Sequence, residues 1–210
     1  MAGSFNLTIF RHGLTLENEK SQYLGWTDAP LSKLGRKDTE KIARLLEGWQ
    51  ADQIITSDLL RCQETSGLLF PNQDFQTNQA LREMNFGSFE GKTYEELKNQ
   101  KDYQLWLDDI FQLSPPGGES FDIFSERVKK GMVEITQSLS TEVNDLVLVV
   151  HGGVLRLLLS TYVVSSKKFF DWKIPNSQGY QLIWENKESF RRLEKCTSLS
   201  EVPSTAKGNG

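Results

Sequence analysis

The chain contains two histidines, and both stand in the same kind of setting. His12 belongs to Arg11-His12-Gly13 and His151 to Val150-His151-Gly152-Gly153, so each follows an apolar run and precedes glycine. A neutral imidazole can attack phosphorus, and the guanidinium fork of an arginine matches phosphoryl oxygens with two hydrogen bonds. We therefore interpret His12 as a nucleophile toward phosphorus and Arg11 as the residue that holds the phosphoryl oxygens.

Three further residues could extend this anion site. Arg61 follows a second short apolar segment and would add another guanidinium. Gly152 would begin a helix, whose free amide groups and positive dipole end favour an anion. Asn18 could add one more hydrogen-bond donor. Together with His151, these residues predict a pocket for the phosphate group of a small ester.

Phosphoryl transfer also requires a proton donor for the leaving oxygen. Glu83 is the candidate, because it lies among apolar residues and such surroundings favour the protonated carboxylic acid. Each residue alone has an ordinary explanation: Arg61 as a solvated side chain, Glu83 as a surface acid, and the glycines as a helix-start turn. Their joint occurrence is what favours this chemistry.

The elements that position these residues follow from the apolar pattern. Apolar runs predict strands over residues 5–10, 54–56 and 146–150, and the last is unbroken, as in a strand buried on both faces. Helices are predicted between them and from Gly152 onward. Alternation of strands and helices implies a mostly parallel sheet with helices on both faces, in which the three strand ends share one edge.

The helix boundaries can also be predicted. Ser32 would cap a helix, and Ser57 or Asp58 would cap the next one, over residues 59–70. Ser120 would begin a longer amphipathic helix. The apolar face of the first helix would carry Leu34, Ile42, Leu45 and Leu46, and that of the last Phe121, Phe124, Val128, Met132 and Ile135.

The middle of the chain is predicted to form a small helical cap over about residues 86–121, with short helices at 93–99 and 102–111. Strand-like segments follow at 178–184 and 190–193. We expect one domain over residues 1–200 and a flexible tail over 201–210, which lacks periodicity. The aromatic side chains of the cap could either pack its helices or stack on a flat leaving group.

Composition narrows the class of protein. Apolar residues make up 38% and charged residues 25% of the 210 residues, which is typical of a soluble globular chain. The net charge of −4 and the absence of a dense basic stripe argue against nucleic acid as a partner. We expect no membrane span and no signal peptide, and Cys62 and Cys196 fit a reducing, cytoplasmic setting. The two cysteines lie far apart, without a CxxC pair or the spacing of a zinc site. We expect no cofactor.

In combination, the motifs resemble those of the histidine phosphatase superfamily, also called the phosphoglycerate mutase-like family. The resemblance runs from about Leu7 to Trp184. It rests on five stretches: Phe10-Arg11-His12-Gly13-x-Thr15-x-x-Asn18, Gly25-Trp26-x-Asp28-x-Pro30-Leu31-Ser32-x-x-Gly35, Thr56-Ser57-Asp58-x-x-Arg61, Leu81-x-Glu83-x-x-Phe86-Gly87-x-Phe89-Glu90-Gly91, and Val149-Val150-His151-Gly152-Gly153.

The resemblance implies a three-layer α/β/α sandwich with a mostly parallel central sheet. It also implies that His12 becomes phosphorylated, that Glu83 protonates the leaving group and then activates water, and that no metal is required. Arg11, Arg61 and His151 would form the rest of the positively charged pocket, with Asn18 assisting.

The branch of the family determines the substrate. The short segment between Glu83 and His151 resembles the phosphatase branch, and Pro115-Pro116-Gly117-Gly118-Glu119-Ser120-Phe121 is similar to α-ribazole phosphatases of cobalamin nucleotide-loop assembly. The leading substrate is therefore α-ribazole 5′-phosphate. A phosphoglycerate mutase, a broad-specificity acid phosphatase and a non-enzymatic phospho-ligand binder stay open as alternatives. The sequence leaves the oligomeric state open, a dimer being one option.

Overall fold

The computed structural model describes residues 3–203, in which six strands form one sheet of order β3-β2-β4-β1-β5-β6. Parallel pairing joins β1 to β4, β4 to β2 and β2 to β3, whereas β5 and β6 are antiparallel to their neighbours. The predicted mostly parallel sheet is confirmed. The strands are β1 (Phe5–Arg11), β2 (Gln53–Thr56), β3 (Gln76–Thr77), β4 (Asp145–Val150), β5 (Gly179–Trp184) and β6 (Ser198–Val202).

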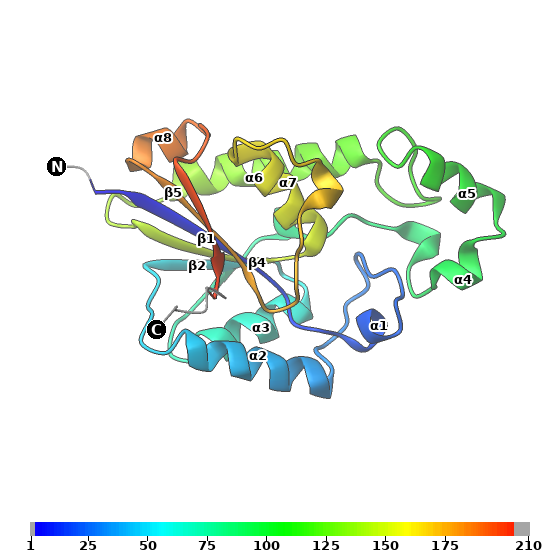
Figure 1. Cartoon of the computed structure of the whole chain (residues 1–210), viewed down its shortest axis with the longest axis horizontal. Coiled ribbons are helices and arrows are strands. Elements are labelled where there is room, and N and C mark those ends of the chain that lie inside the picture. Colours follow the sequence, from blue (N-terminus) through cyan, green and yellow to red (C-terminus); the bar gives the residue numbers. More distant parts are fainter. Residues whose placement is uncertain (1–2, 204–210) are drawn as a thin grey trace.

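Helices cover both faces of the sheet, as Figure 1 shows. On one side lie α2 (Lys33–Leu45) and α3 (Leu60–Leu69). On the other lie α6 (Phe121–Ser138), α7 (Gly152–Tyr162) and α8 (Lys187–Arg191). The expected three-layer α/β/α sandwich is therefore confirmed. No helix within residues 3–203 is long and apolar enough to cross a membrane.

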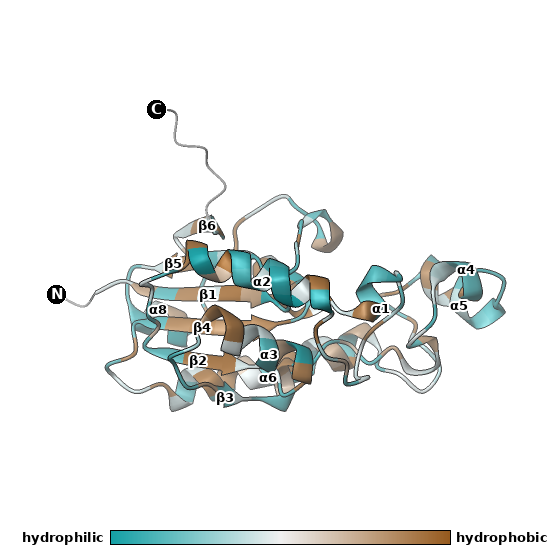
Figure 2. Cartoon of the chain, turned by 90° about the horizontal axis from the view of Figure 1, so that it is seen from below, coloured by the Kyte–Doolittle hydropathy of each residue, from teal (hydrophilic) through white to brown (hydrophobic). Residues whose placement is uncertain are grey.

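The central strand β4 is buried on both faces because it separates two hydrophobic cores. Its alternate residues Leu146, Leu148 and Val150 belong to the core on the α6–α7 side. Val147 and Val149 belong to the core on the α2–α3 side. Apolar residues line the strands along the middle of Figure 2, as a strand sandwiched by helices requires.

The cap lies at one end of the molecule, beyond the carboxyl ends of β1, β2 and β4 (Figure 1). It holds the 3₁₀ turn η2 (Gly87–Phe89), α4 (Tyr94–Leu97) and α5 (Lys101–Asp108), and α1 (Leu16–Glu19) lies beside it. A small core of Phe89, Leu97, Tyr103 and Trp106 holds it together. Two of the cap aromatics, Tyr103 and Trp106, are therefore structural.

The predicted apolar face of α2 is partly wrong. Ser32 does cap the helix, since its Oγ accepts a hydrogen bond of 2.9 Å from Gly35 N. Leu34 and Leu45, however, are 49% and 68% exposed. The buried helix positions are Gly35 and Thr39. The backbone of Leu14 leaves no room for a side chain at position 35, where a Cβ atom would lie 2.0 Å from Leu14 O, and Thr39 Oγ1 shares a hydrogen bond of 2.7 Å with Ser177 Oγ.

The predicted cap of α3 is also wrong. Leu59 occupies the N-cap position without a side-chain bond, and neither Ser57 nor Asp58 caps the helix. The free amide of Leu60 instead donates to Asp28 Oδ1 at 2.7 Å. Asp58 pairs with Arg82, so a contact between distant segments replaces the local cap.

The strand predicted at residues 190–193 is wrong as well. Residues 187–191 form α8, capped by Asn186, and the strand lies farther along, at β6. Phe190 is fully buried and stacks on Phe5 with ring centroids 4.3 Å apart. The helix therefore places the Phe190 ring in the core. Of the predicted tail, Glu201 and Val202 belong to β6, and residues 204–210 lie outside the described residues.

Candidate active site

The candidate residues meet at the carboxyl ends of three neighbouring parallel strands. Arg11 is paired in register with Val150, and Thr56 with Val149. The chain therefore leaves β1, β4 and β2 at the same edge, at His12, His151 and Ser57 respectively. The rings of the two histidines lie 5.2 Å apart between centroids. The predicted convergence of three strand ends is what the structure shows.

His12 is held in one tautomer. Its Nδ1 lies 2.7 Å from the carbonyl oxygen of Gly13. A carbonyl can only accept, so Nδ1 carries the proton and Nε2 keeps its lone pair. Burial and the charges of Arg61 and Arg11 hold the His12 pKa well below its usual 6.5. The ring is therefore neutral near pH 7, with an unprotonated Nε2.

His151 is also fully buried and neutral, because burial, with the nearby charge of Arg61, holds its pKa well below 6.5. Arg61 Nε donates to His151 Nδ1 at 3.3 Å, so the proton lies on Nε2 and is donated to Ser57 Oγ at 2.9 Å. Cys62 Sγ lies 3.5 Å from the same Nε2. The ring is thus fixed from both sides by residues of one segment, 57–62.

Arg61 is a buried cation without an ion-pair partner among residues 3–203. Besides the bond to His151, its Nη1 donates to Thr27 O at 2.9 Å and its Nη2 to Gly25 O at 2.6 Å. Burial lowers its pKa from 12.5. Because a guanidinium has five N–H groups, two of them remain for an anion. The site is therefore electropositive before any ligand binds.

Arg11 adds a second buried guanidinium. Its Nη1 donates to Ile174 O at 2.7 Å, and its buried Nε has no partner among residues 3–203. Burial lowers the Arg11 pKa to about 10, although the charge of Glu83 opposes the shift. An unpaired buried N–H group costs free energy that an anionic ligand would recover.

Glu83 is nearly buried, and both carboxylate oxygens are engaged. Oε2 accepts from Gly153 N at 2.8 Å, and Oε1 accepts from Met84 N at 2.9 Å. The carboxyl group therefore lies at the amino end of α7, the helix that follows His151. Gly153 permits this approach, because a Cβ atom there would lie 2.2 Å from Glu83 Oε1.

The backbone of Glu83 is also fixed. Its carbonyl oxygen accepts from Trp26 Nε1 at 2.9 Å and from Arg127 Nη2 at 3.0 Å. Two guanidiniums lie over the indole of Trp26, with the Cζ of Arg82 5.0 Å and that of Arg127 5.7 Å from the ring centroid. Glu119 accepts two further hydrogen bonds of 2.8 Å from Arg127, one from Nε and one from the same Nη2. Sequence reasoning did not predict this support.

The two remaining predicted residues, Gly152 and Asn18, both lie near Arg11. Gly152 is buried at the first position of α7, where a Cβ atom would lie 3.6 Å from Arg11 Nε. Asn18 and Thr15 form the capping box of α1. Asn18 also lines a cavity of about 310 Å³ together with Arg11, Tyr23, Tyr94 and Asn176.

A second cavity, of about 260 Å³, opens on the other side of Tyr23 and reaches Glu83. Its only charged lining residues are Glu83 and Arg156. Its wall is otherwise apolar and aromatic, with Phe86, Trp106, Phe121, Phe124, Phe169 and Phe170 among the members. Trp106 therefore both packs the cap and faces this cavity.

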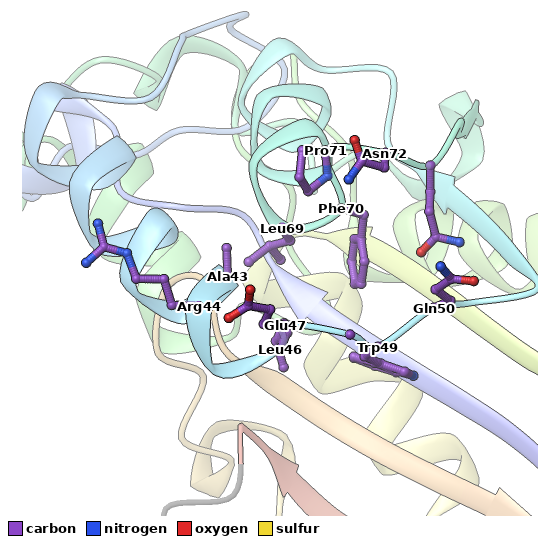
Figure 3. Close-up of a pocket in the computed structure, with 12 residues that line it drawn as sticks. Ala43, Arg44, Leu46, Glu47, Trp49, Gln50, Leu69, Phe70, Pro71 and Asn72 are labelled. Carbon is purple, nitrogen blue, oxygen red and sulfur yellow. The ribbon is translucent and has the colours of Figure 1, made fainter.

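Figure 3 shows a third cavity, of about 440 Å³, formed where α2 and α3 end. Trp49, Phe70 and Leu46 line it, together with Arg44 and Glu47. None of the candidate catalytic residues takes part, so this cavity is separate from the site described above.

Several residues at the site were not predicted. Arg156 is four residues after Gly152 on α7, and that spacing on a predicted helix could have revealed it. Phe169 and Phe170 come from the 3₁₀ turn η3 (Phe169–Asp171), for which the sequence carried no signal.

Comparison with known proteins identifies the family. Residues 7–195 match the model of the histidine phosphatase superfamily (branch 1). The adenosylcobalamin/alpha-ribazole phosphatase of Escherichia coli (strain K12) is 29% identical over 161 residues, which cover 75% of this chain and 78% of that protein. The 2,3-bisphosphoglycerate-dependent phosphoglycerate mutase of Xanthobacter autotrophicus is 30% identical over 170 residues, covering 74% and 79%.

The fold agrees as well. The crystal structure of the alpha-ribazole phosphatase from Shigella flexneri superimposes with a TM-score of 0.78 over 87% of this chain and 92% of that chain, at 24% identity. The fold and the cationic site at its sheet edge define a class of phosphate-handling α/β enzymes. The chain belongs to the histidine phosphatase superfamily, and its class of activity is that of a phosphatase.

A first prediction concerns Gly153. In Gly153→Ala the new methyl group would displace the Glu83 carboxyl. Because the sequence predicts Glu83 as the proton donor, and general acid catalysis contributes about 10²–10⁴-fold, kcat for an alkyl phosphate should fall at least about tenfold. Steady-state phosphate release measures the effect. Gly67→Ala on α3 is the control, because a Cβ there meets nothing within 4 Å. Equal activity of the two variants would contradict the prediction.

A second prediction concerns pH. The pKa values of His12 and His151 are lower in the folded protein than in the unfolded chain. Their contribution to the free energy of unfolding is therefore fully present above pH 6.5 and declines as the pH falls below 6.5. Each histidine contributes up to about 1.4 kcal/mol per pH unit in that window. These are the only histidines, so imidazole NMR signals report them directly. Both should stay neutral down to pH 6.5; a titration midpoint at or above 6.5 would refute the prediction.

Proposed function

We propose that this chain is a metal-independent phosphomonoesterase that works through a phosphohistidine at His12. The observation that carries the proposal is the tautomer of His12: its Nδ1 proton is bound to Gly13 O, so Nε2 is the free nucleophilic atom. The ring is buried beside Arg61 and Arg11, whose charges keep it unprotonated. An unprotonated imidazole beside two cations is what attack on a phosphate dianion requires.

The arginines take the place that a metal ion fills in other phosphatases. In this proposal Arg11 and Arg61 bind the phosphoryl oxygens through their remaining N–H groups, with Asn18, His151 and the amide of Gly152 at the edge of the same pocket. The developing charge is then stabilised by groups that are already oriented. Treatment with a chelator should leave activity unchanged.

Glu83 is proposed as the proton donor to the leaving oxygen and then as the base that activates water. Its carboxyl group is fixed at the start of α7 by Gly153 N and Met84 N. The aromatic cavity begins at this carboxyl group, so the leaving alcohol would lie there while the phosphoryl group faces His12.

We propose a small phosphorylated metabolite as substrate, with α-ribazole 5′-phosphate as the leading candidate and cobalamin nucleotide-loop assembly as its context. The relatives named adenosylcobalamin/alpha-ribazole phosphatase support this choice. The aromatic lining of the cavity would suit a benzimidazole ring. The free thiols Cys62 and Cys196 support a reducing, cytoplasmic setting. Neither nucleic acid nor a membrane is part of the proposal.

Replacement of the nucleophile tests the mechanism. His12→Ala should lose turnover by at least 10³-fold and lose all acid-labile ³²P labelling, because no other side chain replaces the Nε2 lone pair. Labelling is measured after a rapid quench with a phosphorylated substrate. Wild-type activity in His12→Ala would refute the phosphohistidine. Net phosphoryl exchange between 3- and 2-phosphoglycerate, with slow hydrolysis, would instead identify a mutase, as in the Xanthobacter relative.

The acid role of Glu83 has its own test. Glu83→Gln keeps the shape but cannot give up a proton, so hydrolysis of alkyl phosphates should fall about 10²–10⁴-fold. p-Nitrophenyl phosphate, whose leaving group needs no proton, should form the phosphoenzyme nearly as fast as in the wild type. Burst kinetics separate the two steps. An equal loss of phosphoenzyme formation for both substrates would contradict the role of proton donor.

A further inference from the structure

Arg156 is the charged residue at the site that the proposed mechanism does not use. It lies on α7, and its Nη1 would be 3.3 Å from a Cβ atom on Gly152. Arg11 Nε lies 3.6 Å from the same point. Arg156 thus borders the phosphate pocket on one side, and on the other it lines the aromatic cavity with Glu83.

The guanidinium of Arg156 lacks a partner. Within residues 3–203 it forms no ion pair, and its buried Nε has no hydrogen-bond acceptor. Burial lowers its pKa, and the charge of Glu83 acts against that shift. A half-buried cation among aromatic side chains is costly unless an acceptor reaches it. Since no described residue supplies an acceptor for this Nε, the acceptor is expected on a ligand.

The position of Arg156 shows which part of a ligand it can reach. The phosphoryl group lies against His12, Arg11 and Arg61, and the ester oxygen must face Glu83 to receive a proton. Arg156 is on the Glu83 side, inside the cavity. It therefore lies beyond the ester oxygen, beside the first carbon atoms of the leaving alcohol.

We propose that Arg156 binds an acceptor oxygen on the carbon chain of the leaving alcohol and thereby selects among phosphate monoesters. The substrate class is an ester whose alcohol carries a hydroxyl or carboxylate oxygen close to the phosphate and an apolar or aromatic portion farther out. The oxygen pairs with the guanidinium, and the apolar portion fills the cavity of about 260 Å³. This inference rests on the proposed function.

The test uses three esters of one chain length: propyl phosphate, sn-glycerol 3-phosphate and 3-phosphoglycerate. All leave as primary alcohols. Besides the ester oxygen, propyl phosphate carries no oxygen on its carbon chain, sn-glycerol 3-phosphate carries two hydroxyls, and 3-phosphoglycerate carries one hydroxyl and a carboxylate. Arg156→Leu should lower kcat/KM for at least one oxygen-bearing ester by about tenfold or more, and that for propyl phosphate by less than threefold. Arg156→Lys should recover part of the loss, because it keeps the charge but not the fork.

The two oxygen-bearing esters show whether Arg156 binds a hydroxyl or a carboxylate oxygen. A similar loss for both supports a hydroxyl, as in a sugar-like alcohol, and a loss confined to 3-phosphoglycerate supports a carboxylate. Arg44→Leu is the matched control, since Arg44 is exposed at the separate cavity of Figure 3 and its loss removes the same charge from the chain.

An equal loss for all three esters would overturn the inference, because Arg156 would then act on the phosphoryl group or through Glu83. No loss for any ester would overturn it as well, and so would equal effects of Arg156→Leu and Arg44→Leu. Failure of the proposed function looks different: the wild type would hydrolyse none of the three and would take up no ³²P label. Thermal unfolding of all three variants confirms that each is folded during the assay.

Discussion

The site depends on two guanidiniums, those of Arg11 and Arg61, that are buried at one sheet edge and form no ion pair with a carboxylate of residues 3–203. Removing a cation from water costs several kcal/mol unless other groups replace the hydration. Main-chain carbonyls do so here: Thr27 and Gly25 accept from Arg61, and Ile174 accepts from Arg11. Neutral acceptors stabilise the cations without cancelling their charge. The pocket therefore stays attractive to an anion, which an ion pair with aspartate or glutamate would prevent.

The same charges explain why both histidines are neutral. An imidazolium beside Arg61 and Arg11 would be repelled, and burial adds to that cost. Each ring also has one nitrogen fixed by a fold contact, Gly13 O for His12 and Arg61 Nε for His151. Charge and hydrogen bonding thus favour the same protonation state.

The amino end of α7 connects the cationic pocket at Arg11 with the carboxyl group of Glu83. His151 precedes the helix, Gly152 lies beside Arg11, and Gly153 binds Glu83. Arg156, one turn later, faces the cavity beyond. The apolar side chains of the helix lie in the same hydrophobic core as Leu146, Leu148 and Val150 of β4. A short stretch of buried backbone therefore fixes the cation site and the carboxyl group relative to each other.

Sequence alone determined the fold class and the convergence of Arg11, Arg61 and His151. Apolar runs that alternate with helices produce a parallel sheet, and such a sheet brings strand ends to one edge whatever the remaining details. The capping of α2 by Ser32 could also be predicted from the sequence, because the hydrogen bond joins residues only three positions apart.

Tertiary structure decided what depends on contacts between distant segments. Glu83 and Gly153 are 70 positions apart, and the supports of Glu83 come from Trp26 and Arg127. The exposure of Leu34, the capping of α3 by Asp28 and the helix at Phe190 also followed from neighbours that are remote in the chain. A local pattern records the propensity of a segment, but packing against other segments determines which face is buried and which side chain completes a site.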